Sequence, residues 1–109
     1  MDLDLSIRWV RDGKIYDTKT AELVAIIKKT SRYRWEYDDE RTALFLTKKG
    51  QWFIAGEGGA FSRWGREPDG GGDPKPGEGL ELLTEDEARE LLEQIRGDIV
   101  EFYFDVEEG

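Results

Sequence analysis

Histidine, cysteine and asparagine are absent from this sequence of 109 residues. Without cysteine there is no thiol nucleophile and no disulfide bond, and without either cysteine or histidine the usual zinc and haem ligands are missing. The lack of histidine also excludes a Ser-His-Asp triad and any proton transfer by an imidazole. Nothing in the pattern of the remaining carboxylates, tyrosines, lysines and serines indicates a catalytic site. We therefore expect a protein that is not an enzyme and that has no metal or cofactor site.

Long apolar runs and a basic leader are missing as well. No stretch approaches the roughly 20 apolar residues that a membrane-spanning helix needs. The acidic start, MDLDLSIRWV, does not resemble a secretory signal. We therefore expect a cytoplasmic protein with no membrane partner, and a chain of this length is expected to form a single domain over residues 1–109.

The charge is strongly negative and unevenly distributed. The net charge is −9, while residues 67–109 alone carry three basic and fifteen acidic side chains, and residues 26–50 carry a small positive excess. This asymmetry bears on partners and solubility rather than on the fold.

Two hairpins are predicted from turn residues between apolar runs. Alternating apolar residues from Leu3 to Trp9 indicate a strand with one buried face, and Asp12-Gly13 favours a two-residue turn that pairs Val10 with Ile15. The second hairpin turns at Lys48-Lys49-Gly50 and pairs Leu46 with Trp52. Both faces of this second hairpin are apolar, which predicts that it lies in the middle of the sheet or covers a contact with a partner.

The rest of the chain completes an α+β prediction. We expect a short helix over 17–25 followed by a strand from residue 26, in which Tyr33, Trp35 and Tyr37 alternate with basic residues. These aromatics could stack on nucleic-acid bases or pack in the core. The length of the turn that follows does not determine which face of this strand is buried. The net charge of −9 argues against direct nucleic-acid binding.

A helix is predicted after Thr84, which forms a Thr-x-x-Glu capping box with Glu87. Residues 66–79 are rich in glycine and proline and are expected to form a mobile loop, and the alternation in DIVEFYFDV predicts a closing strand. The expected order is β-β-α-β-β-β-α-β on a mainly antiparallel sheet. An unpaired last strand would permit a homodimer through that C-terminal strand.

The stretch GEGGAFSRWG raises the question of why a strand ends in several glycines. It does not fit a P-loop or a dinucleotide fingerprint, although glycines could form a phosphate-binding nest. We expect instead that Gly56, Gly58 and Gly59 permit positive φ angles or a close backbone approach. The alternative is a nucleotide-binding site. Its candidate residues are Trp52, Glu57, Gly58, Gly59, Arg63, Trp64 and Arg66.

The acidic C-terminal third offers a second kind of site. Regularly spaced carboxylates on a rigid element could imitate the phosphates of a nucleic acid, or they could simply keep the surface solvated. The candidate interface residues are Glu85, Asp86, Glu90, Glu93, Glu101 and Asp105.

The stretches GKIYDTKTAELVA, LFLTKKGQWFIAGEGGAFSRW and LTEDEARELLE resemble a family of small uncharacterised bacterial proteins often carried by phages and integrative elements. The resemblance covers roughly residues 13–65 and 80–93 and implies no catalytic residues. It implies an accessory gene of a mobile element, a setting in which small acidic proteins often inhibit host defence. We therefore expect inhibition of a host protein with a basic surface, such as a CRISPR effector, through the acidic surface. The alternative is a binder or sponge for a nucleotide signal.

Overall fold

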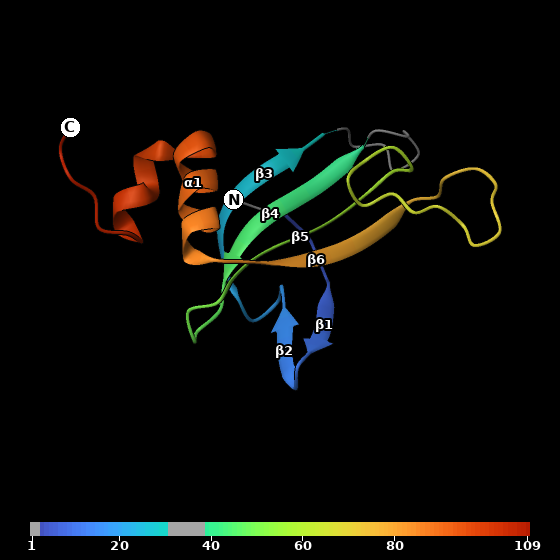
Figure 1. Cartoon of the computed structure of the whole chain (residues 1–109), viewed down its shortest axis with the longest axis horizontal. Coiled ribbons are helices and arrows are strands. Elements are labelled where there is room, and N and C mark those ends of the chain that lie inside the picture. The colour runs from blue at the N-terminus through green and yellow to red at the C-terminus, as the bar shows by residue number, and fades with distance from the viewer. Residues whose placement is uncertain (1–2, 31–38) are drawn as a thin grey trace.

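The computed structural model describes residues 3–30 and 39–109, so Tyr33, Trp35 and Tyr37 lie outside the described part of the chain. The elements in chain order are β1 (Arg8–Arg11), β2 (Lys14–Asp17), β3 (Glu22–Lys29), β4 (Glu40–Leu46), β5 (Trp52–Gly58), β6 (Gly77–Leu83), α1 (Glu85–Ile95) and the 3₁₀ helix η1 (Gly97–Phe102). Strands β3 to β6 form an antiparallel sheet in which each strand pairs with the next, and β1 and β2 form a separate hairpin (Figure 1). The chain is therefore an α+β protein built on antiparallel sheet.

Both predicted hairpins are confirmed, with their registers. Asp12 and Gly13 have positive φ angles of 51° and 75°, and Val10 pairs with Ile15 across this turn. Gly50 has a φ of 91°, and Leu46 pairs with Trp52. As predicted from its two apolar faces, this second hairpin supplies the two central strands, β4 and β5.

The N-terminal arm covers one face of the central hairpin. Leu3, Leu5 and Ile7 are buried against this face, as their alternation predicted, although the paired strand begins only at Arg8. Phe45 and Phe53 stack beneath the arm with ring centroids 5.2 Å apart. The arm is held without a strand ladder because the Thr18 hydroxyl accepts a hydrogen bond from the Ile7 amide and donates one to the Leu5 carbonyl, each at 3.0 Å.

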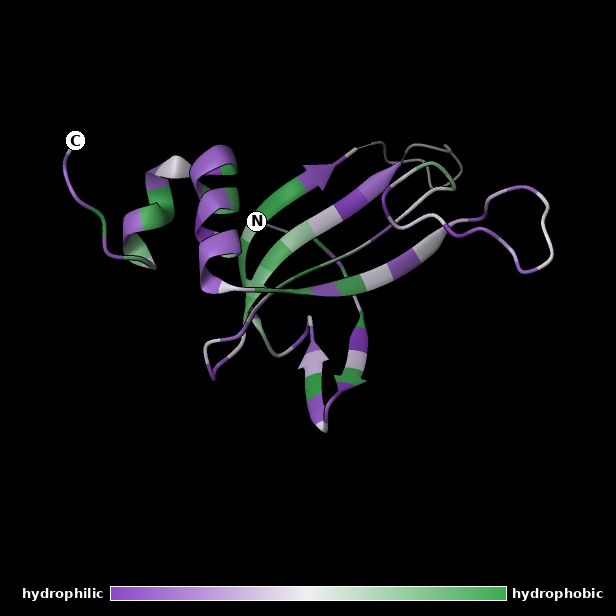
Figure 2. Cartoon of the chain, viewed as in Figure 1, coloured by the Kyte–Doolittle hydropathy of each residue, from purple (hydrophilic) through white to green (hydrophobic). Residues whose placement is uncertain are grey.

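The helical segments cover the opposite face at the end of the sheet near the β4–β5 turn. The predicted capping box begins α1: the Glu87 amide donates to Thr84 Oγ1 at 3.1 Å, and the Thr84 amide donates to Glu87 Oε1 at 2.9 Å. Ala88 and Leu92 are buried beneath α1 with Leu44 and Ile54 of the sheet. Figure 2 shows the matching pattern, since β4 is hydrophilic where it begins and hydrophobic beside α1.

The predicted helix over 17–25 is wrong. Asp17 instead makes a tight turn, in which its side chain accepts a hydrogen bond from the Lys19 amide at 2.8 Å and its carbonyl accepts one from the Ala21 amide at 3.0 Å. Strand β3 starts directly afterwards, because the β-branched Val24, Ile26 and Ile27 favour a strand that can pair with β4.

The predicted loop over 66–79 is too long, because β6 already begins at Gly77. Gly77-Glu78-Gly79 has little strand propensity of its own, but it pairs residue by residue with Gly56-Glu57-Gly58 of β5. The mobility expected of the remaining loop stays a prediction.

The predicted closing strand is also wrong, since its first residues form η1. Val100, Tyr103 and Phe104 are spaced for one face of a helical turn, and the amides of Tyr103 and Phe104 both donate to the Val100 carbonyl at 3.0 Å. This turn places both rings on Trp52, with Phe104 stacked at 5.2 Å and Tyr103 edge-on at 5.6 Å. A homodimer through a C-terminal strand therefore lacks the strand that it requires.

Among residues 3–30 and 39–109, no helix has the length and apolar character needed to cross a membrane.

The contact between Tyr103 and β3 predicts a loss of stability at high pH. Burial, and then the hydrogen bond that the Tyr103 hydroxyl donates to Glu22, raise the pKa of Tyr103 to about 12 from an ordinary value of about 10. Between these pH values the unfolded chain releases a proton that the folded chain retains, so the free energy of unfolding falls as the pH rises. We expect Tyr103→Phe to flatten this fall in urea titrations. A variant with the slope of the wild type would contradict the assignment.

Candidate functional site

The glycine-rich end of β5 pairs with a second glycine-rich triplet. Gly56 lies opposite Gly79, Glu57 opposite Glu78, and Gly58 opposite Gly77. Because side chains alternate between the faces of a strand, the four glycines leave a strip of bare backbone on one face. The two glutamates project from the other face.

The indole of Trp64 occupies this bare strip. A Cβ atom added at Gly56 would lie 2.4 Å from Trp64 Nε1, and one added at Gly79 would lie 2.5 Å from Trp64 Cε3. The indole N–H donates a hydrogen bond to Thr42 Oγ1 at 2.8 Å, across the same row of the sheet. Close approach of an aromatic ring therefore explains the glycines at these positions.

The hydrogen bond to Thr42 continues to a buried carboxylate. Thr42 Oγ1 donates to Glu40 Oε2 at 2.6 Å, and Arg63 Nε lies 3.0 Å from the same oxygen. Glu40 is only 3% exposed, so its charge needs a partner, and the Arg63 guanidinium supplies it. This network fastens the segment that carries Arg63 and Trp64 onto the first residues of β4.

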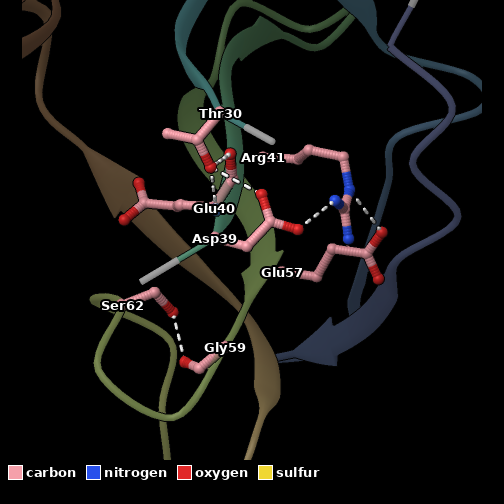
Figure 3. A network of polar contacts seen from close by, with 7 residues as sticks. All are labelled: Thr30, Asp39, Glu40, Arg41, Glu57, Gly59 and Ser62. Atoms are coloured by element: carbon pink, nitrogen blue, oxygen red, sulfur yellow. Dashed lines mark hydrogen bonds and ion pairs between the residues drawn. The ribbon is translucent and has the colours of Figure 1, made fainter. Parts of the chain in front are cut away.

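A second polar network is formed by Thr30, Asp39, Arg41 and Glu57 (Figure 3). Arg41 bridges two acids, with its Nε 3.1 Å from Glu57 Oε1 and an Nη1 atom 3.0 Å from Asp39 Oδ2. The Thr30 hydroxyl donates to the other oxygen of Asp39 at 2.5 Å. Burial lowers the pKa of Arg41, but the hydrogen bonds to Glu57 and Asp39 outweigh it and leave this pKa raised. The guanidinium therefore stays charged and holds both carboxylates.

These contacts give the glycine-rich segment a packing role. Its acid Glu57 and the neighbouring acids Asp39 and Glu40 at the start of β4 are each held by an arginine, and the Gly59 amide donates to the Asp39 carbonyl at 2.7 Å. The Ser62 hydroxyl closes the turn by donating to the Gly59 carbonyl at 2.8 Å (Figure 3). An anion-binding nest requires amides that point at a ligand, whereas the Gly59 amide is already bonded within the protein.

The candidate ligand residues do not all meet. Glu57, Gly58, Gly59, Arg63, Trp64 and Arg66 lie at the glycine-rich end of the sheet, where Arg66 pairs through its backbone with Lys75. Trp52 begins β5 at the opposite end, buried beneath Tyr103 and Phe104. A site that combines Trp52 with the other six residues is therefore excluded by the geometry.

The candidate interface residues, in contrast, lie on neighbouring helical segments. Glu85, Asp86, Glu90 and Glu93 are exposed on α1, Glu101 is exposed on η1, and Asp105 follows η1. Between residues 84 and 109 there are ten acidic and two basic side chains. Both arginines are already paired within this segment, Arg89 with Asp86 and Glu93, and Arg96 with Asp98. We call this segment, α1 and η1 with the residues that follow, the acidic surface.

Apolar side chains are exposed within the acidic surface, which sequence analysis did not foresee. Phe102 is 73% exposed and Val106 is 52% exposed. Val106 also lines a shallow depression of about 400 Å³, together with Glu93, Gly97, Asp98, Val100 and Glu101. The alternation of apolar residues suggested that Phe102 shares the buried face of Val100, but a helical turn points the two residues in different directions.

The fit of Trp64 on the glycine strip predicts a specific loss of stability. In Gly56→Ala the new methyl group would collide with the indole and with the Arg41 carbonyl oxygen, also 2.4 Å away. We expect a cost of about 1–3 kcal/mol in the free energy of unfolding, measured by urea denaturation. Gly97→Ala is the matched control, because a Cβ there meets nothing within 4 Å, and we expect a change of about 0.5 kcal/mol or less. Equal stability of the two variants would contradict the close packing.

Comparison with protein-family models, curated proteins and solved structures gives no match to this chain. The family resemblance inferred from the motifs therefore stays a prediction.

Proposed function

We propose that this chain is a non-enzymatic binding protein that blocks a host protein by placing its acidic surface on a basic, nucleic-acid-binding surface of that partner. The observation that carries the proposal is the combination of exposed carboxylates on two helical segments with an exposed aromatic side chain, Phe102, in the same segment.

The excess of negative charge favours a basic partner. The two arginines of the acidic surface are used in local ion pairs, so most of its carboxylates are left to water. Such a one-signed patch raises the rate of encounter with a positive surface and disfavours other partners. Glu90 and Glu93 follow Asp86 at intervals of four and three residues, which places the three carboxylates on successive turns of α1.

Phe102 and Val106 are apolar side chains that would add affinity to an otherwise charged interface. Charged residues at an interface rim contribute mainly rate and specificity, whereas affinity is concentrated in a few buried anchors, often aromatic. Phe102 is flanked by acids at positions 101 and 105, which corresponds to an apolar anchor within a polar rim.

The buried polar groups support a binding protein over an enzyme. Asp39 and Glu40, the most buried acids among the described residues, are each held by an arginine and a threonine hydroxyl. A general base needs a free lone pair within reach of a substrate proton, and these two groups instead fasten segments of the fold. The resemblance to proteins of mobile elements makes CRISPR effectors the first partners to test.

The proposal predicts that removing four carboxylates strongly weakens inhibition. The substitutions Glu85→Gln, Asp86→Asn, Glu90→Gln and Glu93→Gln are expected to weaken competition with DNA for a purified CRISPR effector by roughly 10- to 100-fold, since exposed ion pairs contribute about 0.2–1 kcal/mol each. Phe102→Ala is expected to weaken it by roughly 30-fold, as for an interface hot spot. Inhibition by the wild type should also fall as salt is added.

The matched control removes four acids elsewhere, by Glu67→Gln, Asp69→Asn, Asp73→Asn and Glu81→Gln. All four of these side chains are exposed outside the acidic surface, so the control makes the net charge less negative by the same amount and should retain inhibition. Full activity in the acidic-surface variant, or equal loss in both variants, would overturn the proposal.

A further inference from the structure

Two hairpin turns that are far apart in the sequence line one depression of about 510 Å³. One side comes from the β1–β2 hairpin and the turn after it, Gly13 to Asp17 with Thr20 and Ala21, and the other side is the β4–β5 turn, Thr47 to Gln51. In Figure 1 the β1–β2 hairpin lies below the sheet, near the end that carries this turn. The stretches GKIYD and TKKGQ, which mark the family resemblance, therefore meet at one place. We call it the lysine pocket.

The lysine pocket is basic in an otherwise acidic protein. Lys14, Lys48 and Lys49 line it, and Asp17 is the only acid among its described lining residues. Within residues 3–30 and 39–109, none of these three lysines forms an ion pair. Asp17 is partly engaged, because its Oδ1 accepts the Lys19 amide. Three ammonium groups without carboxylate partners favour an anion in the space between them.

The remaining walls of the pocket combine a fixed hydroxyl with apolar surface. The ring of Tyr16 is buried edge-on against Phe53, at 6.1 Å between centroids. Its hydroxyl has no hydrogen-bond partner among the described residues, and it is not sealed from water. Gln51 stiffens the opposite wall, since its Nε2 donates to the Trp52 and Leu83 carbonyls at 2.8 and 2.9 Å. Ile15, 56% exposed, adds an apolar side.

From this arrangement we propose that the lysine pocket binds a phosphorylated small molecule of nucleotide size. Lysine ammonium groups bind phosphate as point charges, and the Tyr16 hydroxyl adds a directional donor. Ile15, an exposed apolar side chain among the lining residues, is available to the uncharged part of the ligand. The volume lies within the range of about 300–1,000 Å³ that is typical of small-molecule sites.

A nucleic-acid strand fits the pocket less well than a small molecule. Binding to a polyanion relies on many phosphate contacts spread along a surface, whereas the lysine pocket gathers three lysines at two turns. The net charge of −9 also repels an extended polyanion. The site is separate from the glycine-rich strand end, and it shares no residue with the acidic surface. Failure of one proposal therefore leaves the other standing.

The test is isothermal titration calorimetry of the full chain at low ionic strength with four probes: inorganic phosphate, pyrophosphate, AMP and ATP. We expect at least one nucleotide to bind more tightly than inorganic phosphate. Lys48→Gln with Lys49→Gln should weaken that binding by at least about tenfold, whereas Lys48→Arg with Lys49→Arg retains it. Tyr16→Phe keeps the ring and should cost about tenfold through the lost hydrogen bond.

The matched control is Lys28→Gln with Lys75→Gln, two exposed lysines outside the pocket, which should leave affinity within about twofold. Thermal unfolding of each variant checks that the fold is retained. The proposal is overturned if none of the four probes binds at millimolar concentration, or if Lys48→Gln with Lys49→Gln weakens binding no more than Lys28→Gln with Lys75→Gln does. Tighter binding of a thymidine oligonucleotide than of any nucleotide would also overturn it, in favour of a nucleic-acid surface.

Discussion

The fold depends on one hairpin that is apolar on both faces. In β4 and β5, Phe45 and Phe53 stack on one side, while Leu44 and Trp52 are buried on the other. A sheet with two apolar faces cannot leave either of them in water. The N-terminal arm with the β1–β2 hairpin covers the first face, and α1 with η1 covers the second. The outer elements therefore pack where they do because they bury the two apolar faces of the central strands.

Along β4 and β5 the side chains of the second face change from apolar to polar, and the elements packed on that face change as well. Toward the β4–β5 turn they carry large apolar side chains, which pack against helices. Toward the other end the second face holds Glu40, Thr42 and glycines, where one indole, Trp64, lies flat and is hydrogen-bonded. The same face is therefore covered in two ways. Helices pack on its apolar end, and the Trp64 indole with a polar network covers its glycine-rich end.

Charge is separated on this scaffold. The acidic side chains concentrate on α1 and η1, while three lysines gather where the two hairpin turns meet. At the glycine-rich end, in contrast, Asp39, Glu40 and Glu57 are paired with Arg41 and Arg63. The proposed partner surface and the proposed ligand pocket are thus two places where exposed charges of one sign gather, and the glycine-rich motif serves packing.

Local patterns in the sequence determined both tight turns, the registers of both hairpins, the start of α1 and the acidic excess of the C-terminal third. Each of these depends on neighbours a few residues apart. Tertiary structure decided the rest: β6 forms because its glycines pair with those of β5, and the end of the chain is helical because Tyr103 and Phe104 both reach Trp52. The lysine pocket joins turns about 30 residues apart. The helix and strand propensities of single residues cannot specify such contacts, because packing between distant segments overrides them.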